Sequence, residues 1–164
     1  MYSHQVNEPY GDPYFPFNLG SGGGAIGEGP GGNGGGLFVL SVGELVLDGI
    51  IKANGGNAYP HNHSNLNYSN YSGAGSGGGI LLVAHTFSGN GSIHADGGNF
   101  TNYSGLLKAS AGGGGRVAVW YQQLGGGGFD FTKITAAGGI YTVEQLDEDD
   151  ARLGKDGTVV YYKY

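Results

Sequence analysis

The sequence predicts an all-β fold, a parallel β-helix (β-solenoid) of about three to four coils with glycine-rich corners and inserted loops. Two observations lead to this fold class. Glycine makes up 38 of the 164 residues, several times the share of about 7% that is usual in proteins. A glycine-punctuated phrase also returns at nearly constant spacing, which indicates a repeat architecture.

The repeat consists of two phrases in a fixed order. The first is an isoleucine followed by a turn with two glycines, and its copies begin at Ile51, Ile93 and Ile134, which are 42 and 41 residues apart. The second is a glycine run that leads into an apolar stretch, and one copy precedes each copy of the first phrase. It occupies residues 34–40, 77–83 and 112–120, with a truncated fourth copy at residues 157–162.

Each repeat is expected to contribute two or three short strands. In the first repeat, β-branched and aliphatic residues fill 37–42, 44–47 and 50–53, and an Asp-Gly pair at 48–49 is a turn signal. Strands this short cannot bury an apolar face alone, so neighbouring copies must stack like strand on like strand. Stacking predicts ladders of identical positions. The expected members are Val39, Leu82 and Val119 on the inside, and Lys52, His94 and Thr135 on the outside.

The glycine runs are expected to form the corners of the coils. Glycine adopts positive φ without steric cost and lets neighbouring backbones approach closely. Collagen is excluded, because it requires a strict three-residue glycine period with abundant proline and the chain has only five prolines. We expect one domain, with an N-terminal arm at residues 1–24 and the glycine-rich β-helix at residues 25–164.

Charge and composition narrow the class of partner. The formal net charge is −6 with only seven Lys and Arg, which argues against nucleic acid because nucleic acid requires a basic face. No apolar run approaches the roughly 20 residues of a membrane helix, so no membrane span is expected. The first residues lack the charged and apolar regions of a signal peptide, so we interpret the chain as a mature or excised segment of a longer secreted precursor.

Sequons for N-glycosylation are over-represented. Random placement of the Asn, Ser and Thr residues gives roughly one, whereas the chain has six. Five lie in the insertions between repeats, which emerge on one side of a stack, so we expect one glycan-bearing face and an extracellular or cell-surface location. The alternative is a polar, low-complexity loop without glycans. The expected acceptors are Asn62, Asn67, Asn70, Asn99 and Asn102, with Asn90, in a tight Gly-Asn-Gly turn, the least favoured.

The sequence predicts no catalytic residues, no metal centre and no cofactor beyond covalent N-glycans. His61 and His63 have metal-like spacing, but no third ligand is evident. Lyases and hydrolases of polysaccharides need a grouped acid and base. Asp96 is the only acidic residue between residues 49 and 128, and it takes the repeat position that Asn54 and Ala137 hold in the other copies. A turn is therefore favoured over a catalyst at Asp96.

Aromatic residues are too numerous for the interior of a narrow coil. Tyrosine combines a large contact area with a polar tip, which is typical of interface residues. The same side chains are equally suited to covering the ends and loops of their own chain, so both interpretations stay open. The residues expected at an assembly interface are Tyr10, Tyr14, Phe15, Phe17, Tyr161, Tyr162 and Tyr164.

The order of these phrases resembles a glycine-rich repeat region of very large extracellular and cell-surface proteins in protists, algae and bacteria, including mastigoneme-like proteins. The resemblance rests on Tyr-Gly-Asp-Pro at 10–13, Asn-Leu-Gly-Ser-Gly-Gly-Gly at 18–24, Gly-Gly-Gly at 34–36, Gly-Ile-Ile-Lys-Ala-Asn-Gly-Gly at 49–56 and Gly-Gly-Arg-Val-Ala-Val at 114–119. It covers nearly the whole chain from Tyr10 onward. It implies a right-handed β-helix and a structural or adhesive role, and it carries over no catalytic residues.

We therefore expect an extracellular structural glycoprotein, a subunit of a filament or surface array in which identical solenoids pack end to end. Both ends of a short solenoid expose unpaired strand edges, and such edges pair readily. The alternative is a carbohydrate-binding or adhesin module that uses exposed tyrosines as sugar platforms. A polysaccharide lyase-like β-helix enzyme is the third hypothesis, and it would need an acid and a base brought together by loops.

Overall fold

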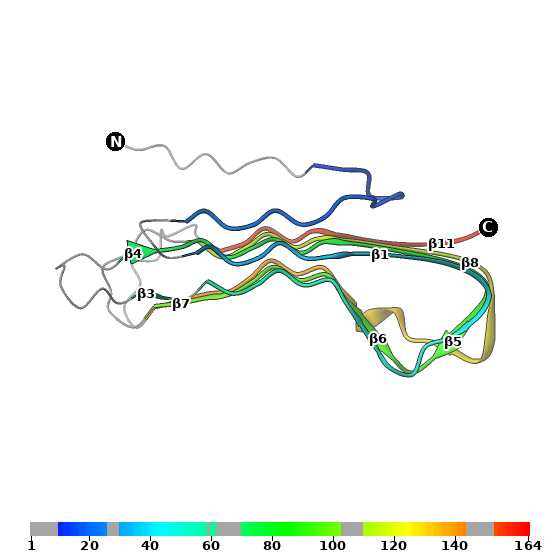
Figure 1. Ribbon diagram of the computed structural model, residues 1–164. Helices are drawn as coiled ribbons and strands as arrows, with labels where there is room; N and C mark the ends of the chain where they lie inside the picture. The colour runs from blue at the N-terminus through cyan, green and yellow to red at the C-terminus, as the bar shows by residue number, and fades with distance from the viewer. Residues whose placement is uncertain (1–9, 26–29, 59, 62–69, 103–109, 144–152) are drawn as a thin grey trace.

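The computed structural model describes residues 10–25, 30–58, 60–61, 70–102, 110–143 and 153–164. Its strands form two main parallel sheets, one above the other (Figure 1). The first sheet has the strand order β1-β5-β8-β11 and the second has the order β2-β6-β9. The strands of the first sheet are β1 (Leu37–Val46), β5 (Gly79–Gly89), β8 (Arg116–Phe129) and β11 (Thr158–Lys163). Those of the second sheet are β2 (Ile50–Lys52), β6 (Ser92–His94) and β9 (Ile134–Thr135).

Two pairs of short strands and a 3-10 helix complete the secondary structure of the described residues. β7 pairs with β10 in parallel, and β3 pairs with β4 in antiparallel orientation. The short strands lie at one end of the molecule, and the main sheets occupy the other end (Figure 1). The bounds are β3 (Pro60–His61), β4 (Asn70–Tyr71), β7 (Phe100–Asn102), β10 (Tyr141–Val143) and η1 (Phe131–Lys133).

The predicted right-handed parallel β-helix is wrong. The strands fall into two separate sheets of four and three strands, and these do not close into a solenoid. The physical reason lies in the glycine runs, to which the sequence assigns corners with positive φ. Among the described glycines, only Gly11, Gly89, Gly127 and Gly128 have positive φ, and none of these belongs to the glycine runs that lead into the strands of the first sheet. The runs before the strands stay extended instead.

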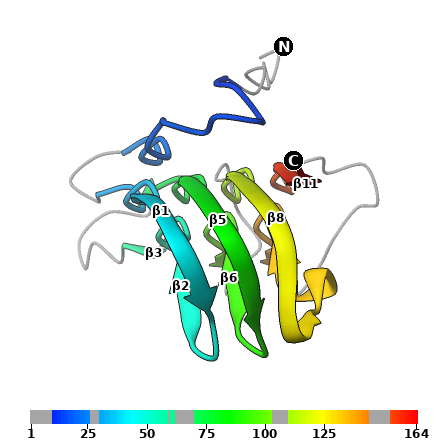
Figure 2. The same cartoon turned by 90° about the vertical axis from the view of Figure 1, so that its right-hand side faces the viewer.

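The predicted stacking of the repeats is confirmed. The three copies of the isoleucine phrase lie side by side, since Ile51 pairs with Ile93 and Ile93 pairs with Ile134 in the second sheet. Figure 2 shows β1, β5 and β8 following one another across the first sheet, with β2 and β6 behind them. The predicted outward ladder also forms, from Lys52, His94 and Thr135.

The predicted inward ladder is wrong in one member. Leu82 and Val119 are buried and paired, as expected, but the residue of β1 that pairs with Leu82 is Leu40 and not Val39. The reason is the alignment of the glycine runs. Gly79, the last glycine of the second run, pairs with the first apolar residue of β1, so the runs do not match at their last glycine.

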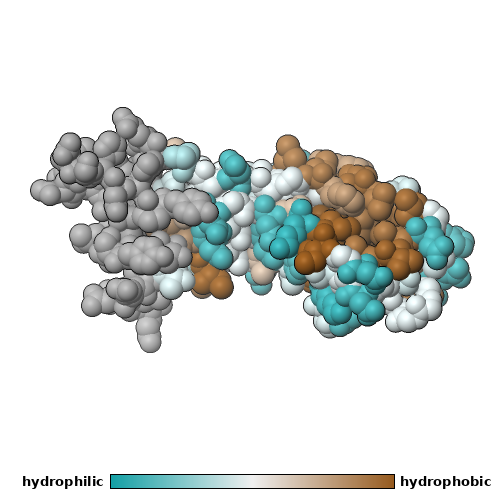
Figure 3. Space-filling view, turned by 60° about the horizontal axis from the view of Figure 1, so that its bottom comes forward, coloured by the Kyte–Doolittle hydropathy of each residue, from teal (hydrophilic) through white to brown (hydrophobic). Residues whose placement is uncertain are grey.

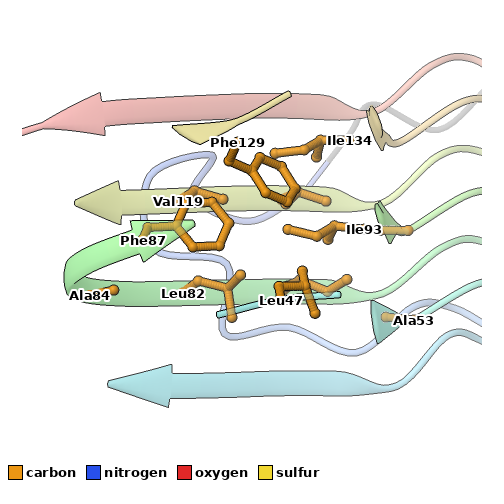
Figure 4. Close-up of a cluster of buried hydrophobic side chains, with 12 residues drawn as sticks. Leu47, Ala53, Leu82, Ala84, Phe87, Ile93, Val119, Phe129 and Ile134 are labelled. Atoms are coloured by element: carbon orange, nitrogen blue, oxygen red, sulfur yellow. The ribbon is translucent and has the colours of Figure 1, made fainter. Parts of the chain in front are cut away.

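Apolar side chains fill the space between the two sheets. The rings of Phe87 and Phe129 have centroids 4.4 Å apart, and Ile93 of the second sheet belongs to the same cluster (Figure 4). Phe87 and Ile93 are fully buried, and burial of one such side chain contributes about 1.5 to 3 kcal/mol. The other buried members are Leu47, Ala53, Ile80, Leu82, Ala84, Ala95, Val117, Val119 and Ile134.

Between the main sheets and the short strand pairs, the glycine-rich stretches run as extended segments that bond to one another. The hydrogen bonds recur at every third residue, since the N–H of Gly75 donates to the carbonyl of Gly56 (2.9 Å) and that of Gly78 to the carbonyl of Ala53 (2.7 Å). Three residues per turn is the repeat of a polyproline II helix, which has no internal hydrogen bonds. The wavy course of these segments in Figure 1 fits this repeat. This half of the molecule is therefore a glycine-rich bundle of polyproline II-like segments.

The bundle segments that belong to the repeats lie in two offset layers. Gly98 of the second layer donates to the carbonyl of Gly75, and its own carbonyl accepts from the N–H of Gly112, at 2.9 Å in both cases. Gly75 and Gly112 belong to two neighbouring segments of the first layer, so the segment with Gly98 lies in the groove between them. The first layer consists of residues 31–36, 73–78, 110–115 and 154–157, and the second of residues 53–58, 95–100 and 136–141.

This packing requires glycine at the points of contact. A Cβ atom at Gly78, Gly115 or Gly157 would lie closer than 3.0 Å to a backbone carbonyl oxygen of the preceding repeat. Rotation of a side chain cannot relieve such a clash, because the Cβ atom itself and the backbone are involved. Close backbone approach, and not the formation of corners, explains these glycines.

The N-terminal arm, residues 10–24, crosses the outer face of the first layer (Figure 1). The side chains of Arg116 and Trp120 donate hydrogen bonds to its backbone carbonyls, at 2.9 and 3.1 Å. Pro16 of the arm is buried. The first part of the arm therefore packs on the four-stranded sheet, whereas residues 20–24 bond to the first layer of the bundle, for example from the N–H of Gly23 to the carbonyl of Gly32 at 2.8 Å. The arm leaves the outermost strands uncovered on their unpaired sides.

Candidate assembly surface

The outermost strands of the sheets have a partner on one side only. β1 and β2 begin the two sheets, β11 ends the first sheet, and no other strand in the described part of the chain pairs with their outer sides. We call the unpaired side of β1 and β2 the β1 edge, and the unpaired side of β11 the β11 edge. An unpaired strand presents a row of N–H and C=O groups to which another chain can bond.

The β1 edge exposes apolar side chains on both of its faces. Phe38 and Val39 alternate across β1 and are 39% and 48% exposed. Near the turn into β2, Val46 and Ile50 are 58% and 62% exposed. Figure 3 shows hydrophobic surface gathered over the half of the molecule that carries the sheets, beside the paler glycine-rich middle. β1 has ten residues, so the β1 edge is a long apolar edge.

The β11 edge is shorter and more polar. β11 has six residues, and its last residue is the exposed Lys163. Tyr161 and Tyr162 alternate across the strand, and each is a little more than half exposed. Beside the strand, the carboxylate of Asp156 accepts a hydrogen bond from the N–H of Gly138 at 2.8 Å. The two edges thus differ in length and polarity, but both leave backbone groups open.

Trp120 gathers three of the predicted interface residues into an aromatic group. The ring of Phe15 stacks on it at 5.5 Å between centroids and 19° between planes, and the rings of Tyr162 and Tyr14 follow at 5.2 and 6.5 Å. Phe15, Tyr162 and Tyr14 are half exposed, so the group forms an aromatic surface on the outer face of the first sheet. Trp120 is not among the interface residues predicted from the sequence, although it is the only tryptophan of the chain.

The remaining predicted interface residues lie apart from the aromatic group. Tyr161 stacks on Phe131 at 4.4 Å on the opposite face of β11. The hydroxyl of Tyr10 donates to a backbone carbonyl within the arm at 2.8 Å. Phe17 and Tyr164 are more than half exposed. Part of the aromatic set therefore packs within its own chain, and its role in an assembly stays a prediction.

Three side chains of a type used in catalysis lie together on the outward face of the second sheet. Ser92 Oγ lies 2.9 Å from His94 Nε2, and Asp96 Oδ2 lies 3.8 Å from His94 Nδ1, whose nearer partner is Thr135 Oγ1 at 2.8 Å. Acyl transfer by a serine needs N–H groups free to bind an oxyanion. The N–H groups of Ser92 and Ala95 instead donate to carbonyls of the neighbouring repeats. The arrangement therefore works as a polar ladder across the repeats.

Side-chain oxygens of Asn and Asp bond the backbone of the next repeat. Asn54 Oδ1 accepts from the N–H of Asp96 at 3.0 Å, and Asp96 Oδ1 accepts from the N–H of Ala137 at 2.9 Å. These three residues hold the same repeat position. Asp96 thus carries a structural hydrogen bond at the junction between the sheets and the glycine-rich bundle.

Two of the six predicted glycosylation sites are described with their side chains, and both are exposed. Asn90 lies in the turn after β5, where its N–H donates to Asp48 Oδ1 and its carbonyl accepts from Lys133 Nζ, each at 3.0 Å. Asn99 Oδ1 accepts from the N–H of Ile140 at 2.8 Å. An N-glycan attaches to Nδ2, so it is compatible with these hydrogen bonds.

The described sequons fall at two ends of the molecule. Asn70 lies in β4, Asn102 ends β7 and Asn99 directly precedes β7, so these three lie at the end away from the main sheets (Figure 1). Asn90 follows β5 at the opposite end. Whether glycans are attached stays a prediction. Outside the described residues lie Asn62 and Asn67.

The titratable groups of the described residues form no metal centre. No set of three or more His, Asp or Glu side chains among them is arranged to hold a metal ion. One carboxylate, the exposed Asp130 at the start of η1, accepts hydrogen bonds from the hydroxyl (2.6 Å) and the N–H (3.0 Å) of Thr132, and these lower its pKa from 3.8. No helix in the described ranges has the length and apolar character to cross a membrane.

Comparisons of the chain with protein-family models, with curated proteins and with solved structures give no match. The function is therefore inferred from the surfaces and contacts described above.

Proposed function

We propose that the protein is a structural building block outside the cell, a glycoprotein whose copies associate through the open edges of the first sheet into a filament or surface array. The observation that carries the proposal is that no strand in the described ranges pairs with the outer side of β1 or of β11, and that both strands expose apolar and aromatic side chains. Proteins that stay monomeric usually blunt such edges with charges, proline or a covering segment. β1 has ten residues with no proline and one charge, so it is open to association.

The glycine-rich bundle supports the role of a stiff unit. Its segments are joined by backbone hydrogen bonds within and between two layers, for example from Gly139 to Gly112 at 2.8 Å. Contacts made by backbone atoms have no rotamers to exchange, so the segments have little room to slide. Such a body is suited to a mechanical role.

The distribution of the sequons supports the same proposal. Asn70, Asn99 and Asn102 lie at the end away from the main sheets, so glycans on them would leave both sheet edges free. Glycosylation of these residues requires passage through a secretory pathway. The resemblance of the repeat phrases to mastigoneme-like surface proteins is in keeping with this location.

The proposal is tested on protein secreted by a eukaryotic host. The intact mass is expected to exceed that of the 16.7 kDa polypeptide, and enzymatic removal of N-glycans is expected to abolish the excess. Sedimentation velocity at rising concentration is expected to show species larger than the monomer, with filaments or arrays in negative stain. Protein that remains monomeric at millimolar concentration contradicts the assembly, and an unmodified polypeptide mass contradicts the glycoprotein.

A second candidate function is carbohydrate binding, and the aromatic group around Trp120 favours it. Exposed aromatic rings offer flat apolar surfaces with polar rims, on which sugar rings pack. A glycan array separates the two functions, because a building block binds no glycan selectively. Selective binding that is lost in Tyr162→Ala and kept in Tyr161→Ala, on the opposite face of β11, would establish the second function.

A further inference from the structure

Three glycines on the β1 edge have no evident reason to be glycine within one copy of the chain. A Cβ atom added at Gly36, Gly43 or Gly49 would meet no atom of the described residues within 4 Å. None of the three has positive φ, so the backbone conformation does not require glycine either. Glycine in an extended segment costs roughly 0.5 to 1 kcal/mol relative to alanine. A constraint outside the single copy would therefore explain why glycine is present at such a position.

The repeat identifies that constraint for Gly36. Its counterparts in the later repeats are Gly78, Gly115 and Gly157, since the residues that follow them pair in register. Each counterpart faces the carbonyl oxygen of the corresponding glycine one repeat earlier, too closely for a Cβ atom. Gly36 is the first of these four glycines, so no earlier repeat places a carbonyl oxygen against it. That place is open in the single copy.

Gly49 follows the same rule in the turn between β1 and β2. Its counterpart, Gly91, faces the carbonyl oxygen of Gly49 too closely for a Cβ atom. Gly43 does not follow it, because the register aligns Gly43 with His85 and Gln122, which carry side chains. Gly36 and Gly49 thus match positions that touch a preceding repeat, and Gly36 is the one that lies within reach of a strand as long as β11.

We propose that the β11 edge of a second copy docks on the β1 edge and continues the first sheet from one copy into the next. The register is the one that the internal repeats use, so Thr158 of one copy pairs with Leu37 of the next, and the carbonyl of Gly157 faces Gly36. This inference rests on the proposed function and adds the interface and its register. A head-to-tail contact of this kind does not close, so it generates a fibre.

The hydrogen bonds across the docked edges follow from those inside the molecule. The N–H of Thr158 donates to the carbonyl of Gly115 at 3.0 Å, as the first bond between β11 and β8. By the same rule, the N–H of Leu37 in the next copy donates to the carbonyl of Gly157. The docked contact repeats an interface that occurs three times within the chain, between the successive strands of the first sheet.

The side chains of the two edges are complementary. In the proposed register Tyr161 pairs with Leu40 on the inner face, and Lys163 pairs with Val42. Glu44, which is exposed, lies two residues beyond Val42 along β1, so the register brings the opposite charges of Lys163 and Glu44 near each other. The opposite charges of Lys163 and Glu44 favour a second copy of this chain as the occupant.

The docked contact begins at Gly36 and runs along the strands, not along the glycine-rich bundle. Asn33 holds the repeat position of Gly75, Gly112 and Gly154, each of which faces a carbonyl of the preceding repeat too closely for a Cβ atom. The side chain of Asn33 therefore keeps the bundle of a second copy at a larger distance. The contact is confined to the half of the edge where apolar side chains are exposed.

Gly36→Ala tests the docking. Its Cβ meets no atom of the described residues within one copy, so the variant is expected to fold with a thermal midpoint equal to or slightly above that of the wild type. In the docked pair the same Cβ collides with the carbonyl of Gly157, so the association constant from sedimentation equilibrium is expected to fall about tenfold or more. Gly43→Ala is the matched control, since it has equal space in the monomer and its counterparts carry side chains. Its association is expected to equal that of the wild type.

Charge reversal gives a second readout. Glu44→Lys is expected to weaken association, and Lys163→Glu in the same chain is expected to restore it. A wild type that does not associate removes the docking and the proposed building block together. Association that is unchanged in Gly36→Ala overturns the docking but not the proposed building block. Pairing of two β1 edges in a closed dimer would give this result. Equal losses in Gly36→Ala and Gly43→Ala also overturn the docking.

Discussion

The sheet half and the glycine-rich half of the molecule stack the same repeats by different means. In the sheet half, side chains such as Phe87 and Ile93 are buried between the layers, and the hydrophobic effect stabilises the stack. In the glycine-rich half, backbone groups bond across the layers, as Gly112 does to Gly98. The first half therefore tolerates changes in side-chain shape, whereas the second tolerates no side chain at its contacts.

The two halves differ in how closely the layers approach. Sheets that pack face to face lie about 10 Å apart because side chains separate them, whereas glycine-rich segments touch through backbone atoms. In Figure 1 the layers diverge from the bundle toward the sheets. The buried residues at the junction are small, namely Ala53, Ala95 and Ala136, which suits an intermediate spacing. Each repeat thus has an alanine where the close packing of the bundle changes to the wider packing of the sheets.

A side chain inside the glycine-rich half is expected to have the largest effect. Gly115→Ala places a Cβ atom against the carbonyl of Gly78, and neither segment can move without loss of its other hydrogen bonds. We expect the free energy of unfolding, from urea denaturation, to fall by about 3 kcal/mol or more. Gly24→Ala in the arm meets no atom within 4 Å and is expected to stay within about 1 kcal/mol of the wild type. Equal stability of the two variants would contradict the close packing of the bundle.

Removal of a ring from the centre of the sheet half is expected to have the next largest effect. Phe87 is fully buried between the sheets, so Phe87→Ala is expected to cost about 3 to 5 kcal/mol, a range that overlaps the loss in the bundle. Phe38→Ala removes the same ring from the β1 edge, where it is 39% exposed, and is expected to cost less than half as much. Denaturation at a concentration that keeps the chain monomeric measures both, and equal costs would show that the edge is packed as fully as the centre.

The stacking could be predicted because it depends on residues whose spacing is visible in the sequence. Ile51, Ile93 and Ile134 recur at a fixed distance, and short strands with one apolar face must pair like with like. The outward ladder of Lys52, His94 and Thr135 follows from the same register. Periodicity of side chains is enough for these features.

The closed solenoid was the wrong prediction because the glycine runs carry no side-chain pattern. A corner with positive φ and an extended polyproline II-like segment both favour glycine, so composition does not separate them. The three-residue spacing that does separate them lies in backbone hydrogen bonds such as those of Gly75 and Gly78. The aromatic group around Trp120 was missed for a related reason, since the arm that supplies Phe15 has no counterpart in the repeats.

Loss of a hydrogen bond at the junction of the two halves is expected to have a smaller effect. Asp96→Ala removes the acceptor for the N–H of Ala137, and we expect a cost of about 1 to 2 kcal/mol in the free energy of unfolding. Asp96→Asn keeps an oxygen at the same position, as Asn54 does one repeat earlier, and is expected to remain close to the wild type. Hydrogen exchange should show faster exchange at Ala137 in the alanine variant only. Equal exchange in both variants would contradict the role of the side-chain oxygen.

Protonation of Asp130 is expected to have the smallest effect and to act on the sheet half. Hydrogen bonds from Thr132 to the charged carboxylate hold the pKa of Asp130 below 3.8. A group with a lowered pKa in the folded state contributes stability that is present above its unfolded pKa and is lost as pH falls through its folded pKa. NMR titration is therefore expected to place the midpoint of Asp130 below 3.8, and Thr132→Val, which lacks the hydroxyl donor, is expected to raise it.

The sheet half and the glycine-rich half are also expected to respond differently to the protonation of Asp130. Asp130 begins the turn that holds Phe131 against Tyr161, so protonation is expected to loosen this side of the sheet half next to β11. The hydrogen bond from the N–H of Gly112 to the carbonyl of Gly98 joins two backbone groups of the bundle, so the amides of these two glycines should not respond to the protonation of Asp130. Amide shifts that move together in η1 and at Gly98 and Gly112 would show that the two halves are coupled more tightly than their separate contacts predict.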